Sequence, residues 1–75
     1  MPTIKRFANC RICINPDEHN PPHFHVVLND GRECLVEITE LTMFGNVPFR
    51  EIRAAMEWAE RNRELLFSKF KEYNP

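Results

Sequence analysis

Residues 23–38, HFHVVLNDGRECLVEI, alternate between apolar and polar side chains on both sides of the turn sequence Asn29-Asp30-Gly31. Alternation with a period of two is typical of a half-buried β-strand, and Asp-Gly between two such runs indicates a hairpin. A two-residue loop would place the histidines among the apolar side chains of the second strand. A three-residue loop, with Gly31 in the left-handed conformation, pairs Val26 with Cys34 and separates the two kinds of side chain. We therefore predict the three-residue loop.

This register predicts a hairpin with one apolar and one polar face, because directly opposed residues of antiparallel strands share a face. The apolar face consists of Phe24, Val26, Leu28, Cys34, Val36 and Ile38. The polar face consists of His23, His25, Glu33 and Glu37, with Val27 and Leu35 beside them. A slip of one residue would exchange the two faces, so burial of the apolar face should determine the pairing.

A strand before the hairpin and a helix after it complete the expected fold. The strand is expected within residues 3–14 and most clearly over about residues 9–14, where apolar and polar side chains again alternate. The helix is expected from Pro48 to about Tyr73, because apolar residues recur there at the spacing i, i+3, i+4 and i+7. Arg63 interrupts this apolar stripe, and asparagine commonly caps helices, so a second helix capped by Asn62 is the alternative.

We predict a single α+β domain over residues 1–75. It consists of a three-stranded antiparallel sheet with one C-terminal helix, continuous or broken near Asn62, packed on the apolar face. The polar face, with its histidines, would then be left open to solvent. A chain of this length buries only about 60% of its unfolded surface, so a homo-oligomer or a partner chain is a reasonable expectation.

The composition is that of an ordinary soluble protein, with 43% hydrophobic residues, 28% charged residues and a formal net charge of −1. This balance disfavours a purely electrostatic nucleic-acid binder, although Lys5, Arg6 and Arg11 precede the first acidic residue, Asp17. No apolar run reaches the length of a membrane span, and the first residues lack the apolar segment of a signal peptide. Three cysteines, an odd number, fit free thiols in a reducing compartment, so we expect a cytoplasmic protein without a membrane partner.

All three histidines lie within the stretch DEHNPPHFH. His23 and His25 are two residues apart on the expected strand and therefore share a face. Because histidine titrates near neutral pH and often binds metals, three interpretations are open. His23 and His25, with His19 or Glu37 as a third ligand, would bind a divalent metal ion. The same histidines with Glu18 or Glu37 would perform general acid–base catalysis, as in phosphodiester cleavage. The third interpretation is a solvated polar face without chemistry.

The expected helix carries residues that suit contacts with a partner protein or with RNA. Arg50 and Arg53 have guanidinium groups whose geometry matches phosphate, although neighbouring glutamates favour a solvated helix face. Trp58 lies off the main apolar stripe. It would either seal the helix against a loop or anchor a partner.

Several stretches of the chain match the pattern of one family. They are Met1-Pro2-Thr3-Ile4, Arg6-Phe7, Glu18-His19-Asn20-Pro21-Pro22-His23-Phe24-His25, Gly45-Asn46-Val47-Pro48, Trp58 and Glu64-Leu65. Over nearly the whole chain they resemble the domain-of-unknown-function 4160 family of short bacterial proteins. Members of that family are often encoded beside a second small protein and are regarded as toxins of type II toxin–antitoxin modules. The resemblance implies matching positions at Glu18, His19, His23 and His25, without a role for any of them.

The resemblance and the histidine stretch together favour a toxin that acts on RNA or on another component of translation. Its enzymatic form would be an endoribonuclease-like hydrolase, and its expected partner is a small antitoxin-like protein from the neighbouring gene. Two alternatives are a non-catalytic protein-binding module that uses the same face and a protein that binds a divalent metal through histidine and carboxylate groups.

Overall fold

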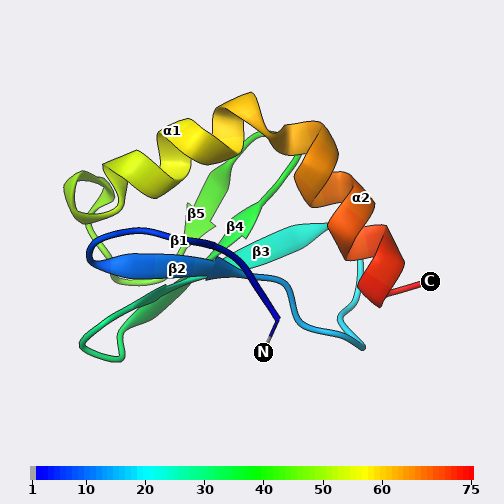
Figure 1. Cartoon of the computed structure of the whole chain (residues 1–75), viewed down its shortest axis with the longest axis horizontal. Coiled ribbons are helices and arrows are strands. Elements are labelled where there is room, and N and C mark those ends of the chain that lie inside the picture. Colours follow the sequence, from blue (N-terminus) through cyan, green and yellow to red (C-terminus); the bar gives the residue numbers. More distant parts are fainter. Residues whose placement is uncertain (1) are drawn as a thin grey trace.

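The computed structural model describes residues 2–75 and shows an antiparallel sheet of five strands with two α-helices on one of its faces (Figure 1). The strands lie side by side in chain order: β1 (Thr3–Arg6), β2 (Cys10–Cys13), β3 (His23–Leu28), β4 (Glu33–Glu37) and β5 (Thr42–Phe44). A short 3-10 helix, η1 (Phe49–Glu51), then leads into α1 (Arg53–Arg61) and α2 (Arg63–Tyr73). The expected α+β class is confirmed.

The β3–β4 hairpin has the predicted register. Val26 lies opposite Cys34 in the paired strands. The loop is closed by a hydrogen bond of 3.0 Å from the backbone N–H of Gly31 to the carbonyl oxygen of Leu28. Gly31 has a φ of 97°, in the left-handed region that the bulged three-residue loop requires. The separation of apolar and polar side chains in the sequence therefore identified the correct loop.

The helices cover the apolar face of the sheet, as predicted. Phe24, Val26 and Val36 are fully buried there, together with Ile12 of β2. The helical region contributes Ile52, Ala55, Met56, Ala59, Leu66 and Phe70 to the same core. Spacings of three and four residues place these side chains on one side of each helix. Complete burial of a large aliphatic or aromatic side chain contributes about 1.5–3 kcal/mol, so this interface provides most of the stabilisation.

The prediction of three strands was wrong, because both edges of the sheet carry an additional strand. The chain turns back between β1 and β2 at residues 7–10, where the N–H of Phe7 donates to the carbonyl oxygen of Cys10 over 2.8 Å. β5 lies between the hairpin and the helical segment, where no strand was predicted, and pairs with β4. The turn between them contains Leu41 at a φ of 55°. Neither turn contains the glycine or proline that usually marks a hairpin in a sequence.

The helical segment is divided at Asn62, which is one of the two predicted arrangements. Asn62 has φ and ψ of −127° and 31°, outside the helical range. Its side-chain amide donates to the carbonyl oxygen of Trp58 over 2.8 Å. Asn62 therefore closes the end of α1 and makes no capping bond to α2, contrary to expectation. The first α-helix begins at Arg53 rather than at Pro48, because η1 follows the proline.

Three segments are joined at the end of the sheet where β3 finishes. The guanidinium of Arg32 donates two hydrogen bonds to the carboxylate of Glu51, over 2.6 and 3.1 Å, and a third to Asp30 over 2.9 Å. The side-chain amide of Asn9 donates to the carbonyl oxygen of Glu51 over 2.5 Å. The β1–β2 turn, the hairpin loop and η1 are therefore connected by polar contacts at this end.

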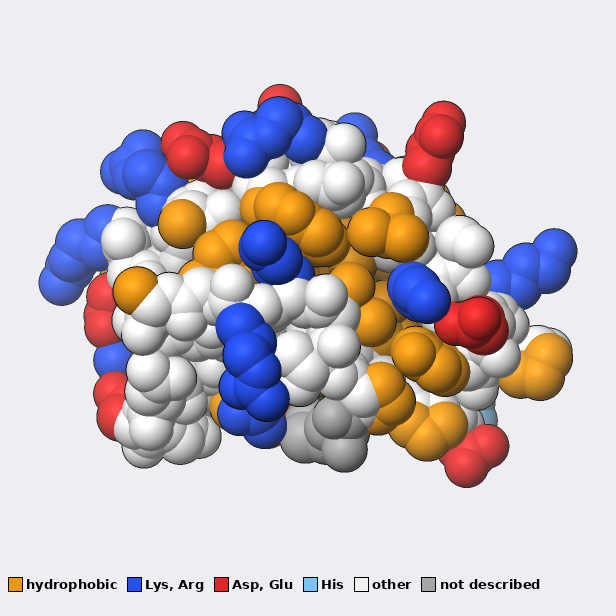
Figure 2. All heavy atoms as spheres, in the orientation of Figure 1, with side chains coloured by type: hydrophobic (Ala, Val, Ile, Leu, Met, Phe, Trp, Pro, Cys, Tyr) orange, Lys and Arg blue, Asp and Glu red, His pale blue; other side chains and the backbone are white. Residues whose placement is uncertain are grey.

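On the side of the molecule drawn in Figure 2, hydrophobic side chains gather below α1, and Lys and Arg side chains lie among and around them. Trp58 packs edge-on against Phe7, with ring centroids 6.3 Å apart and ring planes at 75°. Trp58 therefore takes the first of its two predicted roles and seals α1 against the β1–β2 turn.

Among residues 2–75, no helix is long and apolar enough to cross a membrane.

Candidate functional site

Two strand residues and one loop residue bring their side chains together at the start of β3. His23 and His25 are two residues apart on this strand and lie on its face opposite the core residue Phe24. The β2–β3 loop, residues 14–22, returns Glu18 to the same place. Nε2 of His25 lies 3.1 Å from Oε1 of Glu18, and Nε2 of His23 lies 3.6 Å from Oε2. These three residues are called the Glu18–His23–His25 cluster below.

The cluster is much less exposed than expected. The side chains of His23, His25 and Glu18 are 8%, 15% and 28% exposed. The ring of Phe70, from α2, lies against His23 with 5.5 Å between ring centroids. The expectation that the helix leaves the histidine face open was therefore wrong at this end of the sheet. The reason is the break at Asn62, after which α2 descends toward the start of β3 (Figure 1).

Hydrogen bonds orient both imidazole rings. Nδ1 of His23 lies 2.9 Å from the carbonyl oxygen of Pro21, and Nδ1 of His25 lies 3.1 Å from Oε2 of Glu33. Carbonyl and carboxylate oxygens only accept hydrogen bonds, so each Nδ1 carries a hydrogen and donates it. Both Nε2 atoms consequently face Glu18. In the described part of the chain, the buried Nε2 of His23 has no hydrogen-bond partner.

The loop that carries Glu18 is fastened to the end of α2. The side-chain amide of Asn15 donates to Oε1 of Glu18 over 3.2 Å. The backbone N–H of Glu18 donates to Oδ1 of Asn74 over 2.6 Å, and Nδ2 of Asn74 donates to the carbonyl oxygens of Asn15 and Phe70 over 3.1 Å each. The sequence carries no local signal for Asn74, because it lies 56 residues from Glu18.

Glu18 is ionised at neutral pH. Burial raises the pKa of its carboxyl group, but the hydrogen bonds from His25 and Asn15 and the positive charge of the two histidines lower it by more. The net effect is a pKa below the ordinary glutamate value. When no cation is bound, His25 can donate to Glu18 and Glu33 together only if both of its ring nitrogens are protonated.

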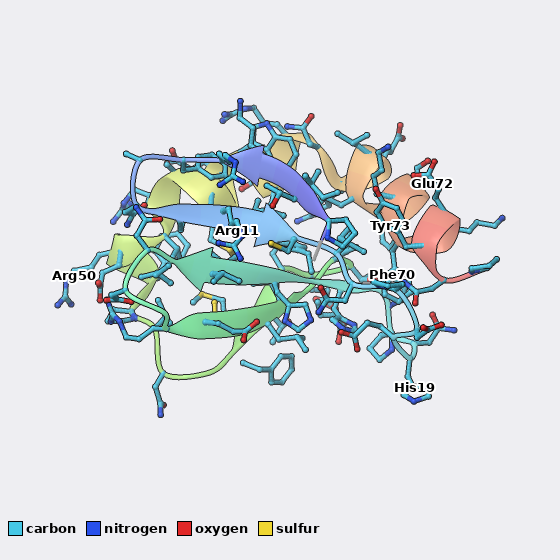
Figure 3. All side chains as sticks on the ribbon, turned by 60° about the horizontal axis from the view of Figure 1, so that its bottom comes forward. Arg11, His19, Arg50, Phe70, Glu72 and Tyr73 are labelled. Atoms are coloured by element: carbon cyan, nitrogen blue, oxygen red, sulfur yellow. The ribbon has the colours of Figure 1, made fainter. Side chains whose placement is uncertain are left out.

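The structure does not bring His19 and Glu37 into the cluster. His19 is exposed and points outward from the β2–β3 loop (Figure 3). Glu37 is half-buried and lies opposite His23 in the β3–β4 pair. Both residues border a groove of about 340 Å³, called the Phe44 groove after its most exposed aromatic ring. The groove is lined by His19, Asn20, Pro21, His23, Leu35, Glu37 and Phe44.

The residues predicted to contact a partner lie away from the cluster. Arg50 is exposed on η1, at the end of the molecule opposite His19 (Figure 3). The guanidinium of Arg53 lies over the ring of Phe49, 5.3 Å from its centroid. Trp58 is half-buried against Phe7, as described above. These side chains therefore form no common surface with the histidines.

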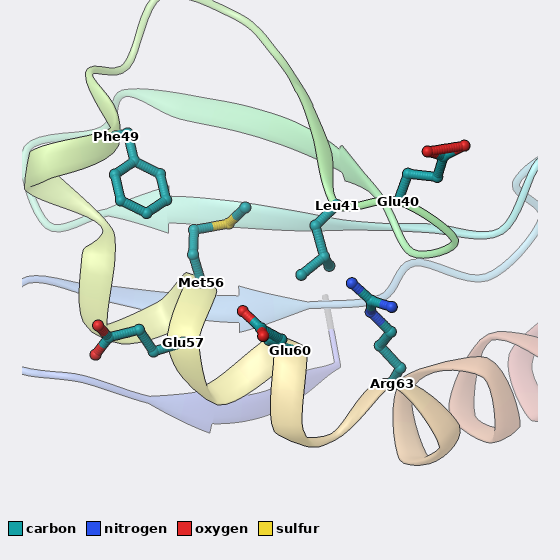
Figure 4. Close-up of a pocket in the computed structure, with 7 residues that line it drawn as sticks. All are labelled: Glu40, Leu41, Phe49, Met56, Glu57, Glu60 and Arg63. Carbon is teal, nitrogen blue, oxygen red and sulfur yellow. The ribbon is translucent and has the colours of Figure 1, made fainter.

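A second hollow, of about 310 Å³, lies on the helical side of the molecule (Figure 4). Its lining consists of Glu40, Leu41, Phe49, Met56, Glu57, Glu60 and Arg63. Arg63 points into the hollow beside Glu60, and its Nε has no hydrogen-bond partner within residues 2–75. None of the histidines reaches this hollow, so it is separate from the cluster.

The cysteines are buried and form no disulfide among the described residues. Cys10 and Cys34 belong to the core, and burial raises the pKa of both thiols, which keeps them protonated. Cys13 lies opposite His25 in the β2–β3 pair. Within residues 2–75, the group of side chains that converges in metal-ligand geometry is the Glu18–His23–His25 cluster, which contains no thiol.

The cluster can act chemically in two ways. Its two Nε2 atoms and its carboxylate can hold a cation, or a protonated His25 and a neutral His23 can donate and accept a proton.

Comparisons of the chain with curated proteins and with solved structures find no match. A family model described as a domain of unknown function, DUF4160, matches residues 9–71, a range that includes the whole cluster. The chain therefore belongs to the DUF4160 family, as the resemblance of its motifs indicated.

Proposed function

We propose that this protein is the toxin component of a bacterial type II toxin–antitoxin module and that its activity resides in the Glu18–His23–His25 cluster. Membership of the DUF4160 family supports the first part, through the role with which that family is associated. The second part is supported by one observation. A single ionised carboxylate lies within 3.6 Å of two imidazole nitrogens in a half-buried site beside a groove.

RNA is the target that the surroundings of the cluster favour. Arg6 lies opposite Arg11, and Arg11 lies opposite Val27, in the paired strands. Because opposed residues share a face, both arginines lie on the face that carries His25. Guanidinium groups bind phosphate oxygens with two parallel hydrogen bonds. An RNA strand crossing β1 and β2 would place its phosphates at these arginines and a phosphodiester near the cluster.

Expression of the protein alone and together with the product of its neighbouring gene tests this proposal. Alone, the wild type should stop growth and degrade bulk RNA, and co-expression should restore both. His25→Gln should abolish inhibition, because glutamine is polar but neither transfers a proton near neutral pH nor binds metal strongly. His19→Gln, an exposed change on the adjacent loop, is the matched control and should stay inhibitory.

Two results would count against the proposal. Normal growth in cells that contain soluble wild-type protein would exclude the toxin assignment. Full inhibition by His25→Gln would leave the toxin assignment in place but remove the cluster from it.

A non-catalytic binding module is the second candidate function, and the Phe44 groove favours it. Phe44 is 54% exposed and lies opposite Leu35 in the β4–β5 pair. Exposed aromatic residues next to an apolar groove commonly anchor a partner chain. Phe44→Ser should then weaken binding of the neighbouring gene product at least about tenfold, whereas His25→Gln should not. Equal binding by the wild type and Phe44→Ser would exclude this candidate.

A further inference from the structure

The donor atoms of the Glu18–His23–His25 cluster converge as metal ligands do. One oxygen or nitrogen donor from each side chain lies within 4.8 Å of the donors of the other two. We propose that these three side chains bind one divalent transition-metal ion, for which zinc is the best match.

The hydrogen bonds of the two rings prepare both Nε2 atoms for this role. In His23, Nδ1 carries the hydrogen, so the unpartnered Nε2 of the neutral ring directs its lone pair toward Glu18. In His25, Nε2 contacts Glu18 over 3.1 Å, and a metal ion would take the place of the hydrogen between them. Histidines that bind metal usually donate their other N–H to a carboxylate or to a backbone carbonyl, which sets the ring orientation. His25 donates to Glu33 and His23 donates to the carbonyl oxygen of Pro21. Both rings therefore have the supporting contact that metal ligation requires.

A cation would also satisfy a polar atom that the protein itself leaves without a partner. His23 is only 7% exposed, and its Nε2 is buried without a hydrogen bond to any residue of 2–75. Such buried polar atoms are rare in folded proteins and call for a specific explanation. A metal ion bonded to this nitrogen would provide the interaction and would balance the charge of Glu18.

The separations of the donor atoms agree with tetrahedral zinc. Zinc bonds to nitrogen and oxygen of about 2.0–2.1 Å place neighbouring ligands of a tetrahedron about 3.3–3.4 Å apart. The carboxylate oxygens of Glu18 lie 3.1 Å from Nε2 of His25 and 3.6 Å from Nε2 of His23. These two distances lie on either side of the tetrahedral value, and the donors of all three side chains lie within 4.8 Å of one another, so side-chain rotation would bring them to one ion.

The chemistry of the donors selects the class of ion. Two imidazole nitrogens and one carboxylate suit zinc and neighbouring transition metals, whereas magnesium and calcium prefer oxygen ligands throughout. Two histidines and a glutamate leave a fourth position for water or substrate, as in catalytic zinc sites. The Phe44 groove adjoins His23 and provides access to that position.

This inference deepens the proposed function. It rests on that proposal only in assuming that the activity resides in the same cluster. Its test is a binding measurement that needs no toxicity. Zinc binding without growth inhibition would support the metal site and exclude the toxin assignment. Growth inhibition by a wild-type protein that binds no zinc would support the toxin assignment and exclude the metal site.

The full chain, freed of metal with a chelator and then exchanged into chelator-free buffer, should be titrated with Zn²⁺ by calorimetry. It should be titrated with Co²⁺ in parallel, followed by visible absorption. We expect one ion per chain and the intense visible bands of tetrahedral Co²⁺. We expect no near-ultraviolet thiolate band, because the cluster contains no cysteine.

Ligand variants and a matched control identify the site. Glu18→Gln and His25→Gln should weaken Zn²⁺ binding at least about 100-fold, and Glu33→Gln, which removes a supporting contact, about 10–100-fold. His19 belongs to the same motif but lies outside the cluster, so His19→Gln should bind Zn²⁺ with the affinity of the wild type. Circular dichroism of the metal-free variants must match the wild type, and His23 is left unchanged because it is buried.

Three results would overturn the proposal. They are the absence of saturable binding of one ion per chain, a thiolate band in the Co²⁺ spectrum, and an equal loss of affinity in His19→Gln and His25→Gln.

Discussion

Replacement of Asn74 by alanine tests whether the end of α2 holds the cluster loop. The substitution removes the acceptor of the Glu18 backbone N–H and the donor to the carbonyl oxygen of Asn15. Both bonds connect segments that are more than 50 residues apart in the chain. The third bond of the Asn74 side chain, to Phe70, lies within the last turn of the helix and contributes only locally.

The expected loss of stability follows from the two long-range bonds. A hydrogen bond of this kind contributes about 0.5–1.5 kcal/mol net, so Asn74→Ala should lower the free energy of unfolding by about 1–3 kcal/mol. A domain of this size has a total stability of about 4–11 kcal/mol. The melting temperature should fall by about 4–8 °C for each kcal/mol lost.

Urea unfolding followed by circular dichroism measures this loss, with Ser68→Ala as the control on an exposed position of α2. The control should stay within about 0.5 kcal/mol of the wild type. The loop that supplies Glu18 would also be freed, so Zn²⁺ affinity should decrease in the folded variant. A free energy of unfolding for Asn74→Ala within about 0.3 kcal/mol of the wild type would refute the reasoning, since it would mean that Asn74 does not hold the loop.

Three further changes test the fold. Gly31→Val should destabilise the protein by about 1–2 kcal/mol, because a β-branched residue is strained at a φ of 97°; an unchanged urea midpoint would contradict the assigned loop. Val36→Asp should sharply reduce soluble yield and melting temperature, since this position is fully buried, whereas Glu37→Ala should change stability by no more than about 0.5 kcal/mol; the opposite order would mean inverted faces. Arg32→Gln should reduce the acid dependence of stability. Hydrogen bonds from Arg32 lower the pKa of Glu51, so the stabilisation is complete above the unfolded pKa of about 4.3 and disappears as the pH falls through the lower folded value. Urea unfolding at several pH values from neutral to acid should show that the free energy of unfolding decreases less with falling pH in Arg32→Gln than in the wild type. An equal decrease in both proteins would contradict this prediction.

The sequence by itself determined the central hairpin and the identity of its two faces. Alternation on both sides of Asp30-Gly31 allows one loop length that keeps Phe24 and Val26 on the same side as Val36, and the structure has this pairing. Period-two and helical patterns are local properties of the chain, so they can be read without knowledge of the fold. The same reasoning placed His23 and His25 together on one face and located the apolar side of α1.

The edges of the sheet could not be derived in this way. β5 is three residues long, too short for alternation to distinguish a strand from a loop, and β1, with the sequence TIKR, does not alternate between apolar and polar residues. They pair because β2 and β4 would otherwise present unpaired backbone N–H and C=O groups at the edges of the sheet. Whether an edge is covered depends on the path of the flanking chain, which only the tertiary structure specifies.

The tertiary structure also decided the character of the site. The histidine motif and Glu18 were evident in the sequence, but Phe70, Asn74 and the role of Glu33 were not. Contacts across more than 40 residues depend on how the break at Asn62 directs α2, and no local pattern encodes that direction. The sequence predicted an open polar face at His23 and His25, but the C-terminal helix packs against His23 and makes this region a half-buried cluster. Within the described chain, Nε2 of His23 is left there without a hydrogen-bond partner.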